Sequence, residues 1–242
     1  MEKYSETFTV RYTDVNSSNH LTLKSLVTYF QEVAGRHSQL AGYSVNDIPN
    51  THVTWLLINW KVKMFIHPQV NDSLQVSTWA RDFEKCYSYR DFEVLDTNGN
   101  LVAIASSKWV LINTDTKKLS NITSEIVNAY GILKTNVFDD NLKFLSKLSV
   151  ENPRLTFSYN IQRRDIDTNG HVNNLHYIDY AFECLPEDIY NKYEFNNIEI
   201  LYKREIKYPN KINCYYSELN GEHIILIKSS DDLTLHSIVK LY

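Results

Sequence analysis

Residues 8–21 read FTVRYTDVNSSNHL, and residues 159–172 read YNIQRRDIDTNGHV, a second version of the same stretch 151 residues further along the chain. Each version starts with an alternating run typical of a strand and passes through a polar turn to a helical pattern. At this offset Asp14 aligns with Asp165, and His20 aligns with His171. A repeat of this length predicts two copies of one structural unit.

In the first copy, residues 21–41 carry apolar side chains at helical spacing, and Gly42 follows where a C-terminal cap belongs. Four β-rich runs come next, with the hairpin signal Asn98-Gly99 before the last of them. We expect these runs at residues 53–66, 73–83, 87–95 and 101–113.

The second copy repeats this plan, with a strand that runs to Arg164 and a shorter helix over residues 174–184. Its β-rich runs are expected at residues 198–208, 212–219, 223–228 and 234–241. The class is therefore α+β, with a long helix wrapped by an antiparallel sheet in each copy. We expect domains at residues 1–130 and 154–242, joined by a connector at 131–153. Within 123–153 the pattern indicates helix and a mobile stretch near 139–141.

The composition is that of a soluble globular protein, with 242 residues, 43% hydrophobic side chains and a formal net charge of -4. It contains no basic run typical of nucleic-acid binding and no apolar stretch of the ~20 residues that span a bilayer. The N-terminus lacks a signal-peptide layout, and the three cysteines form no CxxC pair. We therefore expect a cytoplasmic protein with reduced thiols, no nucleic-acid partner and no membrane span.

Residues 163–174, RRDIDTNGHVNN, bring acid, amide and imidazole groups together between a strand and a helix. Asp167, Asn169 and His171 are spaced by two, so in an extended stretch they would point the same way. The alternative is a purely structural turn, because Asp, Asn and Gly all favour turns. The aligned positions of the first copy are Asn16, Ser18 and His20. Since that copy lacks the acid and the amide, we interpret the second copy as the one with an active site.

The DxNxHVNN pattern, together with residues 11–21 and the segment LYKRE at 201–205, resembles the acyl-acyl carrier protein thioesterases over nearly the whole chain. The resemblance implies two tandem hotdog domains, with the acyl chain held in the first. It also implies a catalytic set of Asp167, Asn169, His171 and Glu205. Plant members commonly have Cys after this Glu, whereas this chain has Ile206, which favours chemistry based on a carboxylate. In the first copy, aligning Pro68 with Pro209 places Met64 opposite Glu205.

Thioester hydrolysis requires a nucleophile, a site for the oxyanion and a proton for the leaving thiol. Glu205 would activate water or attack directly, and Asn169 and His171 would position it. Asp167 would orient the imidazole or tune the second acid. Free backbone N–H groups near Asn173 and Asn174 would hold the oxyanion. Without the resemblance, Glu205 reads as a solvated strand residue paired with a neighbouring lysine.

The implied partner is acyl carrier protein, which is acidic, so the enzyme must present a basic patch to it. The candidates that flank the site in sequence are Arg163, Arg164, Lys203, Arg204 and Lys207. The leading hypothesis is an enzyme of fatty acid biosynthesis that releases free fatty acid from this carrier. An acyl-CoA thioesterase and a non-catalytic acyl-binding module remain as alternatives. Whether the chain forms a homodimer is left open.

Other motifs give little support for a different chemistry. The chain has no GxSxG, GxGxxG or GxxxxGK[ST] pattern, and we expect no cofactor. No metal site is expected, because His20, His37, His52 and His67 lack ligand spacing on one element. Six aromatic residues of the first copy are expected in the core, although some could line an acyl tunnel: Tyr29, Phe30, Trp55, Trp60, Phe65 and Trp79.

Overall fold

The structure is a computed structural model that describes residues 3–138, 142–146, 148, 150–192 and 194–242. It divides into two compact units, Met1–Lys143 and Phe144–Tyr242. We call them unit 1 and unit 2. The stretch 139–141, which was expected to be mobile, lies outside the described residues. No helix among the described residues is long and apolar enough to cross a membrane.

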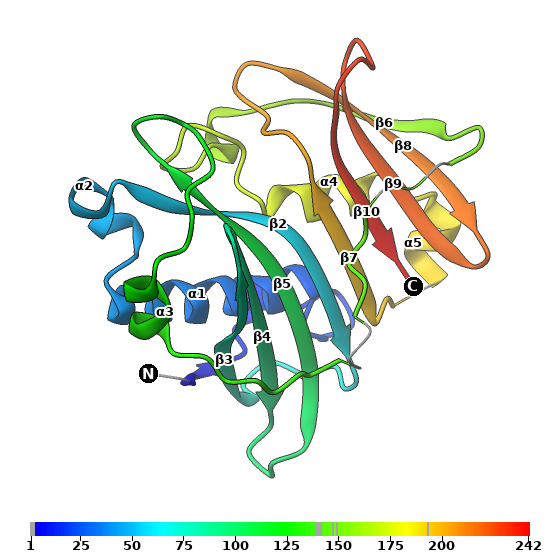
Figure 1. The fold of residues 1–242 in the computed structure, drawn as a ribbon. Helices are drawn as coiled ribbons and strands as arrows, with labels where there is room; N and C mark the ends of the chain where they lie inside the picture. Colours follow the sequence, from blue (N-terminus) through cyan, green and yellow to red (C-terminus); the bar gives the residue numbers. More distant parts are fainter. Residues whose placement is uncertain (1–2, 139–141, 147, 149, 193) are drawn as a thin grey trace. The chain divides into compact units, whose positions relative to one another are not determined.

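Unit 1 contains a five-stranded antiparallel sheet with the long helix α1 against it (Figure 1). The strand order is β1-β3-β4-β5-β2. Its elements are β1 Tyr4–Thr9, α1 Leu23–Ala41, α2 Ile48–Thr51, β2 Val53–Met64, β3 Ser73–Glu84, β4 Tyr87–Leu95, β5 Leu101–Asn113 and α3 Ser124–Tyr130. The four predicted β-rich runs of this copy are confirmed to within two residues at their ends.

Unit 2 repeats this topology with the strand order β6-β8-β9-β10-β7. Its elements are β6 Arg154–Asn160, α4 His176–Glu183, α5 Glu187–Lys192, β7 Asn197–Tyr202, β8 Lys211–Leu219, β9 Glu222–Ser229 and β10 Leu235–Leu241. In both units the first strand pairs with the third, and the second strand lies at the opposite end of the unit's own strand order. This shared order confirms the duplicated α+β hotdog fold.

Helix α1 begins two residues later than expected, after a Thr22 cap, and ends at Ala41, before the expected Gly42 cap. The Thr22 hydroxyl accepts a hydrogen bond from the Ser25 amide at 3.1 Å, and Gly42 has the left-handed φ of 77°. On the buried face of the helix, the ring of Phe30 lies 4.9 Å from that of Phe92 and 5.8 Å from that of Trp60. Burying one such ring contributes about 2 kcal/mol, so this aromatic group anchors the helix to the sheet.

Three predicted boundaries in unit 2 are wrong. The strand expected to reach Arg164 ends at Asn160, and the helix expected from residue 174 begins at His176. The run expected over 198–208 leaves the sheet after Tyr202. The last error has a local cause, because the amides of the next two residues both donate to the carbonyl of His236, at 2.8 and 3.2 Å. Two donors on one carbonyl break the regular ladder.

The aromatic residues of unit 1 divide into buried and partly exposed groups. The four confirmed as core are Tyr29, Phe30, Trp60 and Trp79. Trp55 is only partly buried. The prediction for Phe65 is wrong, since 43% of this residue is exposed. It follows the end of β2, where the chain turns away from the core.

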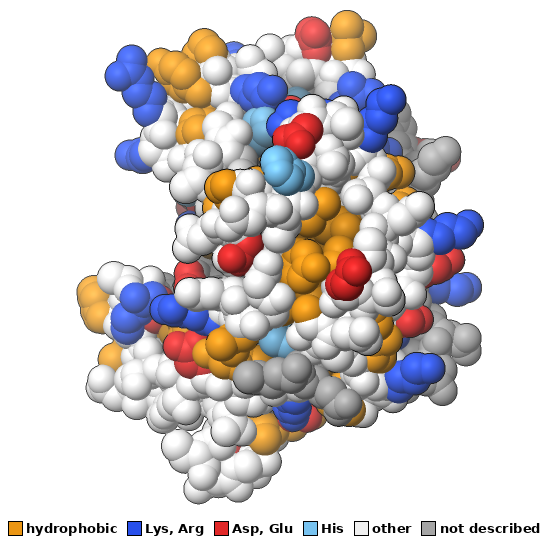
Figure 2. Space-filling model, turned by 60° about the vertical axis from the view of Figure 1, so that its left-hand side comes forward, with side chains coloured by type: hydrophobic (Ala, Val, Ile, Leu, Met, Phe, Trp, Pro, Cys, Tyr) orange, Lys and Arg blue, Asp and Glu red, His pale blue; other side chains and the backbone are white. Residues whose placement is uncertain are grey.

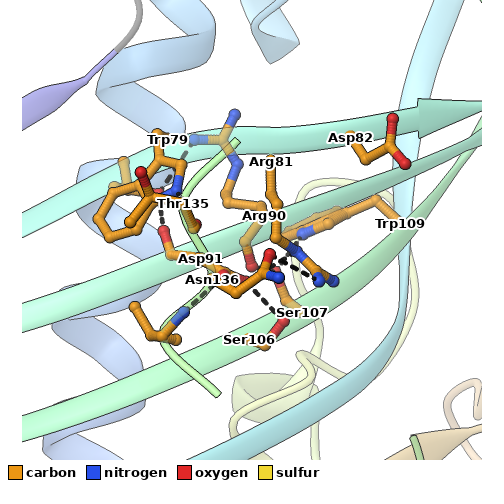
Figure 3. Close-up of polar contacts among 12 residues, drawn as sticks. Trp79, Arg81, Asp82, Arg90, Asp91, Ser106, Ser107, Trp109, Thr135 and Asn136 are labelled. Carbon is orange, nitrogen blue, oxygen red and sulfur yellow. Dashed lines mark hydrogen bonds and ion pairs between the residues drawn. The ribbon is translucent and has the colours of Figure 1, made fainter. Parts of the chain in front are cut away.

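The segment after α3 was expected to continue as helix, but residues 131–138 run in an irregular, extended path that we call the strap. The Leu133 amide donates to the Ala80 carbonyl at 3.0 Å, and the Trp79 indole N–H donates to the Thr135 carbonyl at 2.9 Å (Figure 3). These bonds hold the strap against β3 of unit 1.

Candidate active site

The side chain of Asp167 stabilises the turn in which it lies, residues 167–171. Asp167 Oδ1 accepts hydrogen bonds from the amides of Asn169 at 2.8 Å and His171 at 3.3 Å. The Asp167 amide in turn donates to the His171 carbonyl at 2.8 Å. Gly170 completes the turn with a left-handed φ of 77°. The turn interpretation is therefore correct for the backbone of this stretch.

The first copy forms the same turn with an uncharged side chain. Asn16 Oδ1 accepts from the amides of Ser18 and His20, each at 3.0 Å, and the Asn16 amide donates to the His20 carbonyl at 2.8 Å. Because an amide oxygen does this structural work in unit 1, the turn does not require the charge of Asp167. The negative charge of Asp167 therefore has a reason other than the structure of the turn.

His171 and Glu205 meet although they lie on separate segments of unit 2. Glu205 follows the end of β7, and a hydrogen bond of 2.8 Å from the Val172 amide to the Ile206 carbonyl ties its loop to the turn. His171 Nε2 lies 3.1 Å from Glu205 Oε2. The side chains are 30% and 53% exposed, so both remain accessible to a substrate. Glu205 is on a loop rather than on the strand expected for it.

The second carboxylate oxygen of Glu205 also has a partner. Lys207 Nζ lies 3.1 Å from Glu205 Oε1, so the lysine pairing considered from sequence does occur. The carboxylate is therefore held at both oxygens, by an imidazole and an ammonium group. Ile206 is buried beside it and offers no nucleophile. In this arrangement the Glu205 carboxylate can activate a water molecule or attack a carbonyl carbon directly.

The expectation of free backbone donors is wrong for Asn173. Its amide donates to the Asp165 carbonyl at 2.8 Å, so this N–H group is already used inside the turn. The Asn173 side chain caps the following segment by accepting from the Leu175 amide at 2.9 Å. Asn174 contributes its carbonyl to the Tyr202 hydroxyl at 3.1 Å. The helix start was misplaced by two residues, which is why Asn173 was expected to be free.

Comparison with known proteins identifies the family of this chain. A family model described as the acyl-ACP thioesterase N-terminal domain matches residues 1–130, and the corresponding C-terminal domain model matches residues 150–239. The chain belongs to the acyl-ACP thioesterase family. The family resemblance expected from the DxNxHVNN motif is confirmed.

Among curated relatives, an oleoyl-acyl carrier protein thioesterase of Coriandrum sativum is 27% identical over 231 residues, covering 88% of this chain and 62% of the relative. Oleoyl-acyl carrier protein thioesterase 2 of Arabidopsis thaliana is 28% identical over 217 residues, covering 84% and 59%. Both relatives are named as chloroplastic. The chain thus spans about three fifths of the length of these relatives.

Solved structures show the same fold. An acyl-ACP thioesterase from Bacteroides thetaiotaomicron superposes with a TM-score of 0.88 at 22% identity, covering 99% of this chain and 96% of the other. The 12:0-ACP thioesterase from Umbellularia californica gives a TM-score of 0.87 at 22% identity, with the same coverage. At this identity the likeness concerns the fold.

The basic residues suggested for this family member are all exposed. Arg163 and Arg164 lie in the short 3₁₀ turn Arg163–Asp165 rather than on a strand. Lys203, Arg204 and Lys207 lie in the loop after β7. The two segments meet where the guanidinium of Arg163 lies 5.8 Å from the centre of the Tyr208 ring. The structure therefore brings the two basic segments together beside Glu205.

The counterpart of Glu205 in unit 1 is His67, and the expected Met64 is wrong. In unit 2 the turn after the histidine reaches the Ile206 carbonyl through the Val172 amide. In unit 1 the Leu21 amide makes the same contact with the carbonyl of Pro68, at 2.7 Å. Since Leu21 is the counterpart of Val172, Pro68 is the counterpart of Ile206. His67 directly precedes Pro68, as Glu205 directly precedes Ile206, so His67 is the counterpart of Glu205.

The neighbouring backbone bonds support this register. Phe65 and Ile66 donate to one carbonyl, that of Val102, as Lys203 and Arg204 donate to that of His236. The rings of His20 and His67 lie with their centroids 5.6 Å apart, where unit 2 has the pair of His171 and Glu205. Unit 1 therefore lacks the acid at this position, as expected, although the residue that replaces it was misidentified.

Tyr177 is a residue beside the site to which the sequence assigned no role. It lies on α4 and is buried, with its ring centroid 5.3 Å from that of Tyr202. Burial raises the pKa of the Tyr177 phenol, and the nearby carboxylates of Glu205 and Asp167 raise it further. Its hydroxyl is therefore a neutral group near two acids. Its place three residues after the DxNxHVNN motif is the only sequence feature that connects it with the site.

Proposed function

We propose that this protein hydrolyses the thioester of fatty acyl-acyl carrier protein, giving free fatty acid and the carrier, as a step of fatty acid biosynthesis. The observation that carries the proposal is the 3.1 Å contact between His171 and Glu205 in unit 2. The equivalent position in unit 1 carries no acid, so the pair is not required by the fold. Family membership supports the same reaction.

The mechanism follows from the groups at hand. Glu205 takes a proton from water, and the water oxygen attacks the thioester carbonyl carbon. The C–S bond then breaks, and the proton returns to the leaving thiolate. His171 holds the carboxylate in position, and Asp167 stabilises positive charge on the imidazole. Direct attack by Glu205, followed by hydrolysis of the anhydride, requires the same residues.

The remaining site residues are proposed to bind rather than react. The Asn169 side chain, which is exposed on the turn, orients the water or the carbonyl oxygen. The Asn174 amide is the remaining candidate for the oxyanion, because that of Asn173 is used. We place the reacting residues in domain 154–242 and the acyl chain in domain 1–130, with 131–153 as the connector. No cofactor or metal takes part in this scheme.

The carrier is proposed to dock on the basic residues beside Glu205. Arg163 and Arg164 on the turn and Lys203, Arg204 and Lys207 on the loop present exposed positive charge. Acyl carrier protein is acidic, so this charge would speed its association and set its orientation. We propose a cytoplasmic location because the three cysteines are buried free thiols, which suits a reducing compartment.

The test is thiol release from a panel of acyl-acyl carrier protein thioesters, with wild type, Glu205→Gln and Glu218→Gln compared. Glu218 is an exposed acid of the same unit on β8, which makes it a matched control. We expect Glu205→Gln to lower kcat by about 10²–10⁴-fold, the usual contribution of a general base, while Glu218→Gln matches wild type. Equal rates for all three proteins would refute the role of Glu205.

The carrier assignment needs its own comparison. We expect the double variant Arg163→Glu/Arg164→Glu to raise KM for acyl carrier protein substrates and leave KM for the matching acyl-CoA unchanged. Higher salt should weaken the wild-type preference for the protein carrier. Faster turnover of acyl-CoA than of the protein thioester would favour the CoA alternative. Binding without turnover on either carrier would favour a non-catalytic acyl-binding module.

A further inference from the structure

His236 is a buried histidine of unit 2 that the proposed mechanism does not use. Figure 2 shows that histidine side chains of this protein can lie at the surface beside acidic and basic groups. His236 differs from these, because only 6% of the residue is exposed. It is the second residue of β10, and its carbonyl accepts from the amides of Lys203 and Arg204, the bonds that end β7. The residue therefore lies against the loop that carries Glu205.

The side chain of His236 contacts the same loop. Its Nδ1 atom lies 3.1 Å from the carbonyl oxygen of Arg204. A carbonyl oxygen only accepts, so Nδ1 carries the hydrogen. Burial lowers the pKa of the His236 imidazole below its usual value, although hydrogen bonding to the backbone of Arg204 and Glu205 opposes this shift. The ring is therefore neutral at neutral pH and donates to the loop through Nδ1.

This hydrogen bond fixes the backbone before Glu205, and the turn fixes the backbone after it. The Arg204 carbonyl belongs to the peptide group that leads into Glu205. The carbonyl of the next residue, Ile206, accepts from the Val172 amide at 2.8 Å. Since the Glu205 side chain is 53% exposed, packing around it is incomplete. The placement of its carboxylate therefore depends on these two anchored carbonyl groups.

The counterpart of His236 in unit 1 is Val102. Each is the extra residue of a β-bulge, because pairing skips His236 in the ladder of β10 with β9 and Val102 in the ladder of β5 with β4. The Val102 carbonyl accepts from two loop amides, as the His236 carbonyl does. A valine side chain has no hydrogen-bond donor, so the loop in unit 1 forms without one. The histidine thus occurs in the unit that has the acid, at a bulge that can redirect a side chain.

We propose that His236 is a positioning residue for the hydrolysis. Its Nδ1–H group holds the Arg204 carbonyl, and through it the backbone of Glu205, in the orientation at which the carboxylate meets His171 and acts on the thioester. The imidazole itself does not touch the substrate. This proposal rests on the proposed function and adds a residue to the same site. A displacement of about 1 Å at a reacting group can cost about 10²-fold in rate, so one hydrogen bond behind Glu205 has a measurable effect.

The experiment measures kcat and KM for thiol release from one acyl-acyl carrier protein thioester. The variants are His236→Val, which copies unit 1, and His236→Asn, whose side-chain amide places an N–H donor near the position of Nδ1. His223→Val is the matched control. His223 is only 4% exposed, and its Nδ1 atom lies 2.8 Å from the Tyr216 hydroxyl, in a bond that joins β9 to β8.

We expect His236→Val to lower kcat by at least about tenfold and to leave KM within about twofold, because the exposed basic side chains are unchanged. His236→Asn should restore kcat to within about threefold of wild type, because the donor is restored. His223→Val should keep kcat within about twofold of wild type, although it also loses a buried hydrogen bond. In the Glu205→Gln background, adding His236→Val should change the residual rate by less than about twofold, because His236 acts through Glu205.

Three results would overturn the proposal: a loss of kcat below about tenfold in His236→Val, equal rates for His236→Asn and His236→Val, or an equal loss in His223→Val. If His236→Val does not fold, ¹⁵N NMR of the histidine rings in wild type provides a second readout. A neutral His236 with its hydrogen on Nδ1 is expected, and a hydrogen on Nε2 would contradict the contact. Absence of turnover in wild type would refute the proposed function and this proposal with it, whereas full turnover by His236→Val would refute this proposal alone.

Discussion

Replacing Asp167 separates the structural role of this residue from its proposed chemical role. Its Oδ1 atom accepts two amide hydrogen bonds in the turn, and Asn16 accepts the equivalent pair in unit 1. Asp167→Asn keeps this acceptor and removes the charge. Asp167→Ala removes both. At about 0.5–1.5 kcal/mol per net hydrogen bond, and with the turn partly solvated, we expect Asp167→Ala to cost about 1–2 kcal/mol.

The same reasoning predicts that Asp167→Asn changes the free energy of unfolding by less than about 0.5 kcal/mol while lowering kcat by about 10²-fold or more. Urea denaturation measures the first quantity, and thiol release from an acyl-acyl carrier protein thioester measures the second. Asn16→Ala is the matched control, because it removes the same two bonds from unit 1 and should cost a similar 1–2 kcal/mol. A loss of stability in Asp167→Asn as large as in Asp167→Ala would refute the account of the turn. Full turnover by Asp167→Asn would refute the chemical role of the acid.

Three further outcomes follow from individual contacts. Although burial alone would raise the pKa of the Asp14 carboxyl, hydrogen bonds from Arg11 and Tyr29 lower it, so its stabilising effect is present above about pH 4 and is lost as the pH falls further. In urea denaturation, the free energy of unfolding should therefore fall less between pH 7 and pH 3 for Asp14→Asn than for wild type. Gly170 has a left-handed φ, and its unit 1 counterpart is an asparagine with φ 63°. Urea denaturation should therefore give Gly170→Asn a free energy of unfolding about 1 kcal/mol higher than that of Gly170→Ala. A thiol reagent at pH 8 should leave the proposed thiol-release activity of the native protein unchanged, because burial raises the pKa of Cys184 to about 11; rapid inactivation would contradict this.

The fold could be predicted because its elements depend on local patterns that recur twice. The helix α1 is set by apolar spacing between the Thr22 cap and Gly42, and both lie within its own sequence. The boundaries that failed depend on distant partners. The end of β7 is fixed by the His236 carbonyl, which lies 34 residues after Tyr202 in the chain. The path of the strap depends likewise on bonds to Trp79 and Ala80.

Some residues of the candidate site could be predicted from the sequence, and others could not. The pairing of His171 with Glu205 was expected from the family resemblance, and the two side chains do meet. The amide of Asn173 could not be assigned from sequence, because its acceptor is a carbonyl across the turn. His236 gave no signal either, because the carbonyl that its ring contacts lies 32 residues earlier in the chain.

The misidentified counterpart of Glu205 shows how a repeat should be aligned. Pro68 and Pro209 were matched because they are identical, but Pro68 directly follows His67, whereas Pro209 lies four residues after Glu205. The loops after β2 and β7 begin alike and then diverge, so residue identity within them is a poor guide to position. The hydrogen bonds to Leu21 and to its unit 2 counterpart are a better one, because they fix the backbone on which the side chains stand. Aligned in this way, the two units share the turn and the loop contact and differ in the ionisable groups. A loss of acidic groups at Asn16 and His67, on a turn and a loop contact that both units share, is what one active site in a duplicated fold requires.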